Sequence, residues 1–292
     1  MNIRPFIIMG ILVFTVLICA VGHLRISAEA TPESQIIKKK NNIREPEPIP
    51  DEPPPVPLLI QQINESNAKI GSISCGKIDV KVWRSGMRFK LSGELYYEKR
   101  QRFRFKIASV FGEEIDIGSD DKCFWYWSRR DKDPGLHWAN YKDFTKTRLK
   151  TPFNPMFMKK SLSLDVLNTE KARIVETKED YILVYATKNG SGQPILASIF
   201  INKAKQRIDG MIVTDMGANP IASVEIQEYR DGIPSKILYI WQKEDQALLL
   251  ELKNPKINVS IPASKWGMPD YKPKLNMAED VNQIGAEGVS GS

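Results

Sequence analysis

The chain has 292 residues, of which 42% are hydrophobic and 26% are charged, a composition that excludes a disordered or fibrous protein. Its formal net charge of +7 is modest, and its basic residues are interspersed with acidic ones, so the charge alone selects neither nucleic acid nor anionic lipid as a partner. Three cysteines in a chain of this length exclude a small fold built on disulfides.

The amino terminus has the pattern of an export signal. Arg4 precedes residues 6–22, which carry no charge, and Ala28-Glu29-Ala30 offers the small residues that a signal peptidase accepts. Residues 1–30 are therefore expected to be a cleaved signal peptide. A retained N-terminal membrane anchor is the alternative, because the apolar stretch is near the lower limit for spanning a bilayer. We expect a periplasmic or cell-envelope protein, anchored only if this segment is retained.

The cysteines leave two questions open. Lipid attachment at Cys19 is a third fate for the export segment, although Ile18 stands where lipoprotein signals place a small residue. Export puts the mature chain in an oxidising compartment, where Cys75 and Cys123 could form a disulfide if their strands are adjacent. Two buried free thiols are the other reading, and the sequence does not choose between them.

Residues 31–57 are predicted to form a linker. Three consecutive lysines at 38–40 precede seven prolines between residues 46 and 57, a composition that favours a semi-rigid, extended spacer. The folded domain is expected to span residues 58–266. It begins with LLIQQINESNAKI, in which Leu59, Ile63 and Ile70 fall near helical spacing and predict one amphipathic helix.

Residues 75–128 change to the period of two that is typical of half-buried strands. RFRFKIAS gives the clearest alternation, with Phe103, Phe105 and Ile107 on one face and basic residues on the other. KIDVKVW, RFKLSGELYY, EEIDIG and the aromatic run KCFWYW complete a predicted meander of five antiparallel strands with one apolar face and one charged face.

The second half of the chain repeats this pattern after an interruption. Asn154 as a cap and Pro155 at the first helical position predict a short helix. From residue 172 onward, apolar segments separated by turn signals bring the predicted total to about twelve strands. Residues 267–292 are polar and carry several glycines, so we expect a disordered tail.

So many consecutive antiparallel strands with one apolar face must curl, because a twisted sheet of this width does not stay flat. We therefore predict a mainly β fold with two or three helices, a curled antiparallel half-barrel of about 11–12 strands with its apolar side inward. With so few helices to fill it, the half-barrel would enclose a hydrophobic cavity, unless its own side chains close the interior.

Three stretches of sequence resemble a known family. GKIDVKVWRSGMRFKLSGELYYEKRQRFRFKI, FGEEIDIGSDDKCFWYW and ILYIWQKEDQALLLELKNPKINVSIP are similar to the strands of the LolA/LolB-type periplasmic lipoprotein carriers. The resemblance covers about residues 58–262 and rests on alternation rather than on invariant residues. It implies an incomplete barrel whose cavity receives the acyl chains of lipoproteins, and a role in lipoprotein sorting or delivery. A related domain of this family is an envelope sensor. The long proline linker departs from the carriers and puts free shuttling in doubt.

Alternate residues of a strand lie on the same face of a sheet, and this rule selects the candidate lipid-binding residues. Within the aromatic run, Trp125 and Trp127 share one face with Cys123, and Phe124 and Tyr126 share the other. We expect the two tryptophans to face inward, because the tyrosine hydroxyl favours a wet end. The candidate cavity residues are Phe89, Leu91, Leu95, Phe103, Phe105, Ile107, Ile115, Ile117, Trp125 and Trp127.

The turn SVFGEE is a candidate membrane contact. LolB-type members carry a protruding apolar residue at the turn between their third and fourth strands, and Val110 and Phe111 occupy that place here. The resemblance implies that this hairpin touches a membrane, and the basic residues Arg102, Arg104 and Lys106 would attract an anionic surface. The alternative is that Phe111 folds back onto its own sheet.

The sequence offers little chemistry for catalysis. His137 and two cysteines beyond the export segment are too few for a usual zinc site, and no G-x-S-x-G motif is present. On the basic strand the aromatic residues alternate away from the cations, which argues against a platform for single-stranded nucleic acid. We expect a non-enzymatic protein that needs no cofactor or metal and binds acyl chains. The competing interpretation is a sensor or a structural protein-interaction module with a filled β core.

Overall fold

The structure is a computed structural model that describes residues 54–84, 86–99, 101–129, 135–147, 155–162, 164–189, 192–242 and 245–278. The predictions on the export segment, on most of the proline-rich linker and on Asn154 fall outside these residues. Within the described ranges, no helix is both long enough and apolar enough to cross a bilayer.

The chain alternates between two runs of strands and short helical segments. The first run follows α2 (Val56–Ala68) and comprises β1 (Ser72–Arg84), β2 (Met87–Glu98), β3 (Arg102–Ser109), β4 (Gly112–Ser119), β5 (Cys123–Ser128) and β6 (Leu136–Asn140). The insertion contains η2 (Tyr141–Lys146), α3 (Pro155–Ser161) and η3 (Thr169–Lys171). The second run comprises β7 (Arg173–Glu176), β8 (Asp180–Lys188), β9 (Pro194–Asn202), β10 (Arg207–Asp215), β11 (Pro220–Arg230), β12 (Ile233–Trp241) and β13 (Gln246–Leu252). The chain then forms β14 (Lys256–Ile257), η4 (Ala263–Lys265) and β15 (Lys274–Asn276).

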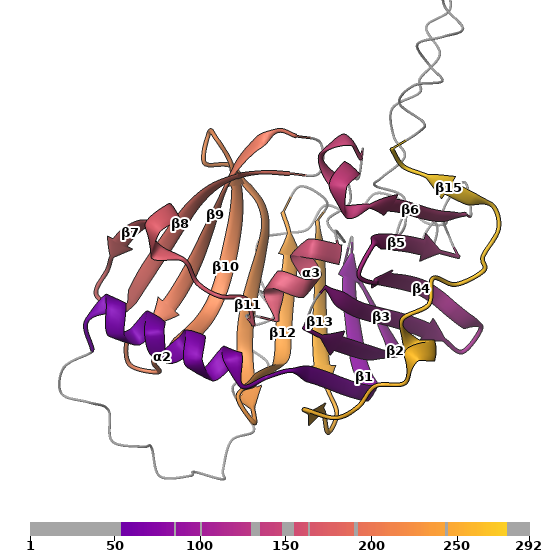
Figure 1. Cartoon of the computed structure of the whole chain (residues 1–292), viewed down its shortest axis with the longest axis horizontal. Helices are drawn as coiled ribbons and strands as arrows, with labels where there is room; N and C mark the ends of the chain where they lie inside the picture. The colour runs from indigo at the N-terminus through magenta and orange to yellow at the C-terminus, as the bar shows by residue number, and fades with distance from the viewer. Residues whose placement is uncertain are drawn as a thin grey trace, which may run out of the picture.

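All the strands belong to one open sheet. Its order is β15-β6-β5-β4-β3-β2-β1-β13-β12-β11-β10-β9-β8-β7, with β14 paired to β1 off this path, and every pairing is antiparallel except β15 with β6. The central seam joins β1 to β13 in a register that places Val80 opposite Leu250. Figure 1 shows the sheet curling around α3, with α2 along one end of β8–β11. The predicted half-barrel is confirmed. The short strands β6, β14 and β15 were not predicted from the sequence.

The concave face carries the core. Inward side chains from both runs of strands form one apolar cluster, which extends from Phe105 on β3 across the seam to Ile237 on β12. A second cluster joins α2 to the other end of the sheet, where Leu59 and Ile63 pack with Leu183. The alternation on the strands and the helical spacing on α2 therefore turn their apolar residues toward a common interior.

The aromatic run divides between the two faces as predicted, but with the opposite assignment. The register pairs Ile117, an inward residue, with Tyr126, and it pairs Gly118 with Trp125. Tyr126 accordingly joins the concave core, whereas Trp125 and Trp127 lie on the outer face, so the prediction that these two tryptophans line the cavity is wrong. A Cβ atom at Gly118 would lie 2.3 Å from the Trp125 ring, which shows how closely that ring covers β4.

Tryptophans can be buried on the outer face because a later segment of the chain covers it and shields it from solvent. Residues 260–276, here called the strap, cross the outer side of β2–β5 and end in β15 beside β6 (Figure 1). Leu136 N–H donates to Pro273 O at 2.8 Å, and Met277 N–H donates to Trp138 O at 2.9 Å. The expected disordered tail is therefore wrong for residues 267–278. Residues 279–292 are outside the described ranges.

Both cysteines in the described part are free and buried. Cys75 belongs to the concave core and Cys123 to the cluster on the outer face, so the sheet separates the two thiols. Burial raises the pKa of both thiols, that of Cys123 to about 12 with the help of the nearby Asp120 carboxylate. The second of the two readings, buried free thiols, is the one that the structure supports.

Candidate functional site

Eight of the ten predicted cavity residues lie on the concave face. Six of them are buried: Leu95, Phe103, Phe105, Ile107, Ile115 and Ile117, three of which (Phe105, Ile107 and Ile117) have no exposed surface at all. Phe89 and Leu91 are half-buried and pack against the same cluster. The shared parity that selected these residues on β2, β3 and β4 therefore brings them together. Their role in binding lipid remains a prediction.

The helical insertion fills the curve above this face. Met158 on α3 and Leu162 and Leu164 after it are buried in the concave cluster. Ser161 anchors the helix end, because its hydroxyl donates to Met158 O and shares a 2.5 Å hydrogen bond with the buried Tyr239 hydroxyl. Burial raises the pKa of Tyr239, so this phenol stays neutral and available for that bond. Sequence reasoning did not select Tyr239, although the alternation of its strand contains the signal.

Half-buried apolar residues border the filled concave core. They include Phe89 and Leu91 on β2, Phe157 on α3 and Ile199 on β9. They come from both halves of the sheet and from the helix between them.

Two surface hollows lie elsewhere. One of about 180 Å³ is bordered by Trp83, Trp241 and Gln246 at the turns that end β1 and β12. The other lies between α2 and residues 166–170, where Asn64 hydrogen-bonds to both backbone groups of Leu167. Neither hollow is lined by the predicted cavity residues.

The β3–β4 turn presents its two apolar residues to solvent. Val110 is 94% exposed and Phe111 is 74% exposed, so Phe111 does not fold back onto its sheet. Phe111 N–H donates to Ser109 Oγ at 3.0 Å, and Arg129 donates to Phe111 O. The turn is thus shaped by hydrogen bonds that leave both side chains pointing outward.

The basic residues on β3 do not form a free cationic strip. Arg102 pairs with Asp121 at 2.8 Å, and Lys106 pairs with Glu113. Arg104 is buried against Asp116 at 2.6 Å. The expectation that these three cations attract an anionic bilayer is weakened, because a carboxylate neutralises each of them.

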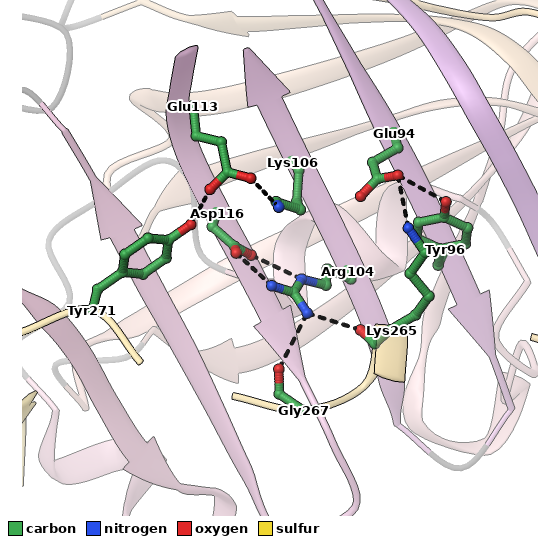
Figure 2. Close-up of polar contacts among 9 residues, drawn as sticks. All are labelled: Glu94, Tyr96, Arg104, Lys106, Glu113, Asp116, Lys265, Gly267 and Tyr271. Carbon is green, nitrogen blue, oxygen red and sulfur yellow. Dashed lines mark hydrogen bonds and ion pairs between the residues drawn. The ribbon is translucent and has the colours of Figure 1, made fainter. Parts of the chain in front are cut away.

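Arg104 and Asp116 form the centre of a polar network beneath the strap (Figure 2). The guanidinium donates to both oxygens of Asp116, at 3.1 and 2.6 Å, and its Nη1 donates at 3.1 Å to both Lys265 O and Gly267 O of the strap. Burial raises the pKa of the Asp116 carboxyl, and the charge and hydrogen bonds of Arg104 oppose that rise. The strap both covers the pair and accepts the hydrogen bonds of the guanidinium nitrogen that Asp116 does not engage.

Two further carboxylates hold the strap on either side of this pair. Lys265 Nζ lies 3.0 Å from Glu94, and the Tyr271 hydroxyl donates to Glu113, as Figure 2 shows. The Tyr271 ring also stacks on Trp127 with a centroid separation of 4.1 Å. Sequence reasoning missed this arrangement, because its partners are far apart in the chain.

The described residues contain no group of three or more His, Cys, Asp or Glu side chains that could hold a metal ion.

Comparison with known proteins identifies the fold. No family model matches this sequence, and no curated protein matches it. A putative outer membrane lipoprotein-sorting protein domain from Vibrio parahaemolyticus is similar in structure, with a TM-score of 0.50 and 9% identity over 72% of this chain and 95% of that one. A DUF1329 family protein from Desulfovibrio piger has a TM-score of 0.48 and 9% identity over 72% and 94% of the two chains. A LolA superfamily protein from Nitrosomonas europaea has a TM-score of 0.47 and 10% identity over 72% and 97%.

The similarity is one of architecture, because identities near 10% carry no residue-level information. The chain shares the fold of the lipoprotein-sorting protein domain from Vibrio parahaemolyticus, a curled antiparallel sheet of the kind that the sequence resemblance implies.

Proposed function

We propose that this chain is an exported, non-enzymatic lipid- or lipoprotein-binding protein that acts in lipoprotein sorting or delivery at the cell envelope. The observation that carries the proposal is the continuous apolar concave face, which spans both halves of the sheet and is bordered by half-buried apolar residues such as Leu91 and Phe157. An acyl chain is the ligand class that such a face fits, because binding needs no polar partner.

An acyl chain can compete with α3 for this face. Burying one methylene stabilises by about 0.8 kcal/mol, so about ten methylenes gain roughly 8 kcal/mol before the costs of binding. Displacing Met158, Leu162 and Leu164 costs about 1.5–3 kcal/mol for each fully buried side chain. The two terms are of the same size, so displacement of these three side chains by an acyl chain is energetically feasible.

The test is direct extraction combined with a matched pair of variants. We expect solvent extracts of the purified full-length protein to contain lipid by mass spectrometry. Leu91→Gln, on the concave face, should reduce binding of a fluorescent fatty acid by about tenfold or more, since it places an amide in the acyl path. Leu196 is also half-buried but alternates away from the concave residue Ile199, so Leu196→Gln is the control. Equal binding by both variants would remove the concave face from the proposal.

We further propose that Val110 and Phe111 contact the membrane during lipid hand-off. Two exposed apolar side chains at a hairpin tip gain up to about 1.5–3 kcal/mol each when they enter a bilayer interface. Changing both to Ser should weaken co-sedimentation with liposomes by about tenfold or more and leave fatty-acid binding intact. Because the nearby cations are paired, added salt should change the association little.

Val166→Ser is the matched control for this tip. Val166 is 76% exposed but lies beside α2 rather than on the hairpin. Liposome association that is the same for parent and the Val110/Phe111 double variant would exclude the hairpin as the membrane contact.

A protein-interaction module with a filled β core is the second candidate. The observation that favours it is the complete burial of Phe105, Ile107 and Ile117 beneath the helical insertion. Extracts free of lipid, together with a fatty-acid probe that does not bind, would support this candidate over the carrier.

The proposed location is the periplasm or cell envelope. It rests on the export pattern of residues 1–30. Amino-terminal sequencing of the protein purified from its native membrane or soluble fraction distinguishes cleavage, lipidation at Cys19 and retention as an anchor. A soluble protein in the cytoplasm that keeps Met1 would contradict export.

A further inference from the structure

The end of the β3–β4 hairpin is offset from the rest of the sheet. The pairing of β3 with β4 is irregular between Ile107 and Ala108, so the last two pairs, Ala108 with Glu113 and Ser109 with Gly112, lie beyond a bulge. On the other side, β4 pairs with β5 only from Ile115 onward. A bulge bends and twists a strand, so the ladder alone leaves the direction of the tip weakly determined.

Two braces reach the hairpin beyond this bulge. The first comes from the end of β5, where Arg129 N–H donates to O of the bulge residue Glu114 at 2.9 Å and the Arg129 side chain donates to Phe111 O, beyond the bulge. The second comes from the strap, where the Tyr271 hydroxyl donates to Glu113 Oε2 while Lys106 occupies Oε1 (Figure 2). Glu113 is the first residue of the tip beyond the bulge, and both of its carboxylate oxygens are engaged.

The strap brace is itself held rigidly. The Tyr271 ring lies at 13° to the Trp127 ring with centroids 4.1 Å apart, and Trp127 belongs to β5 in the body of the sheet. Arg104 binds Gly267 O upstream of Tyr271, and β15 pairs with β6 downstream of it. These contacts on both sides therefore hold the Tyr271 hydroxyl in place on the outer face.

From this geometry we infer that the strap sets the direction in which the β3–β4 hairpin presents Val110 and Phe111, with Tyr271 as the positioning residue. The inference rests on the proposed membrane contact for its biological consequence. The effect of Tyr271 on the direction of the hairpin does not depend on that membrane contact. Tyr271 of the strap binds Glu113, whose carboxylate lies beyond the bulge. The position of the strap on the outer face therefore determines the position of the exposed tip.

Tyr271→Phe tests the inference because it removes the hydroxyl and keeps the ring that stacks on Trp127. Hydrogen exchange of the full chain should show amides of residues 109–114 exchanging about tenfold faster, the effect of losing a hydrogen bond to a charged group. Tyr229→Phe is the matched control, since it removes a 2.7 Å hydrogen bond to Ile208 O on the distant β11–β10 pair. Glu113→Gln, which removes the charge that Tyr271 and Lys106 share, should reproduce the effect of Tyr271→Phe.

Exchange at residues 109–114 that is the same in Tyr271→Phe and in the parent would overturn the inference. Faster exchange spread evenly over β1–β6 would also overturn it, because the strap would then be a general stabiliser rather than a brace for the tip. With vesicles of phosphatidylethanolamine and phosphatidylglycerol, Tyr271→Phe should weaken association less than the Val110→Ser, Phe111→Ser double variant does. If that double variant binds these vesicles like the parent, the membrane contact fails while the exchange result still decides the positioning role.

Discussion

Arg104 shows what a covered outer face permits. On an exposed sheet its guanidinium would pair loosely with Asp116 and contribute little. Here the strap buries the pair and supplies the carbonyls of Lys265 and Gly267 as acceptors, so the donors that Asp116 leaves unused are also satisfied. The residue thereby ties a buried charge to the position of the strap.

Removing one partner of this pair should cost far more than removing both. Arg104→Met leaves Asp116 buried and unpaired, so we expect a loss of about 3–5 kcal/mol in the free energy of unfolding, measured by urea denaturation. Adding Asp116→Leu to Arg104→Met should recover much of that loss. Arg102→Met, which breaks an exposed pair on the same strand, should have a much smaller effect. A double variant less stable than Arg104→Met would contradict this account.

At the scale of elements, the strap is held by carboxylates that titrate in acid. Burial would raise the pKa values of Glu94 and Glu113, but hydrogen bonds outweigh it and lower both. The donors are Tyr96 and Lys265 for Glu94, and Lys106 and Tyr271 for Glu113. A carboxyl with a lowered pKa in the folded state stabilises that state above its ordinary pKa and loses this contribution as the pH falls through the lowered value.

The strap should therefore loosen below about pH 4, the ordinary range of glutamate. We expect hydrogen exchange of residues 260–276 to accelerate in that range before exchange in α2 does. The fluorescence of Trp127 should change over the same interval, because Tyr271 leaves its face. Glu113→Gln should remove part of this pH dependence. A strap that is equally protected at pH 3 and pH 7 would show that its apolar contacts suffice.

The elements that the sequence predicts are those with a regular period. Phe103, Phe105 and Ile107 alternate with charges, and the structure places them together on the concave face. The strap has no such period, and its partners are distant: Lys265 meets Glu94 at a separation of 171 residues. Trp125 and Trp127 were misassigned for the same reason, since the strap, with Met268 and Tyr271, covers an outer face that alternation alone would leave exposed to solvent. Parity fixes which side chains share a face but not which face is covered.

At the scale of the whole molecule, the two runs of strands depend on one seam. β1 and β13 join residues that are far apart in the chain, and Val80 and Leu250 meet there without exposure to solvent. Inward residues of both halves belong to the same cluster. The two halves are thus parts of one cooperative sheet rather than separate units.

Leu250→Ala should accordingly destabilise both halves at once. Truncation of a fully buried leucine costs about 2–5 kcal/mol. We expect amides in β3–β5 and in β8–β10 to lose protection together in hydrogen exchange, and chemical denaturation to remain a single transition. Faster exchange confined to one half would show that the seam separates two independently stable parts.

The route of the strap also determines how the molecule responds to force. Its attachments to Glu94, Arg104 and Glu113, and finally to β6, follow one another along the chain as it crosses successive strands. Tension applied at the carboxyl terminus would act on β15 first and then on each attachment in turn. The contacts would therefore break one after another rather than all together. Tension applied along β1 would instead shear all of its pairings with β2 and β13 together. The carboxyl end is thus the part of the protein that resists force least, and a pull there would uncover the tryptophans of the outer face while the pairings between β1 and its neighbours stay intact.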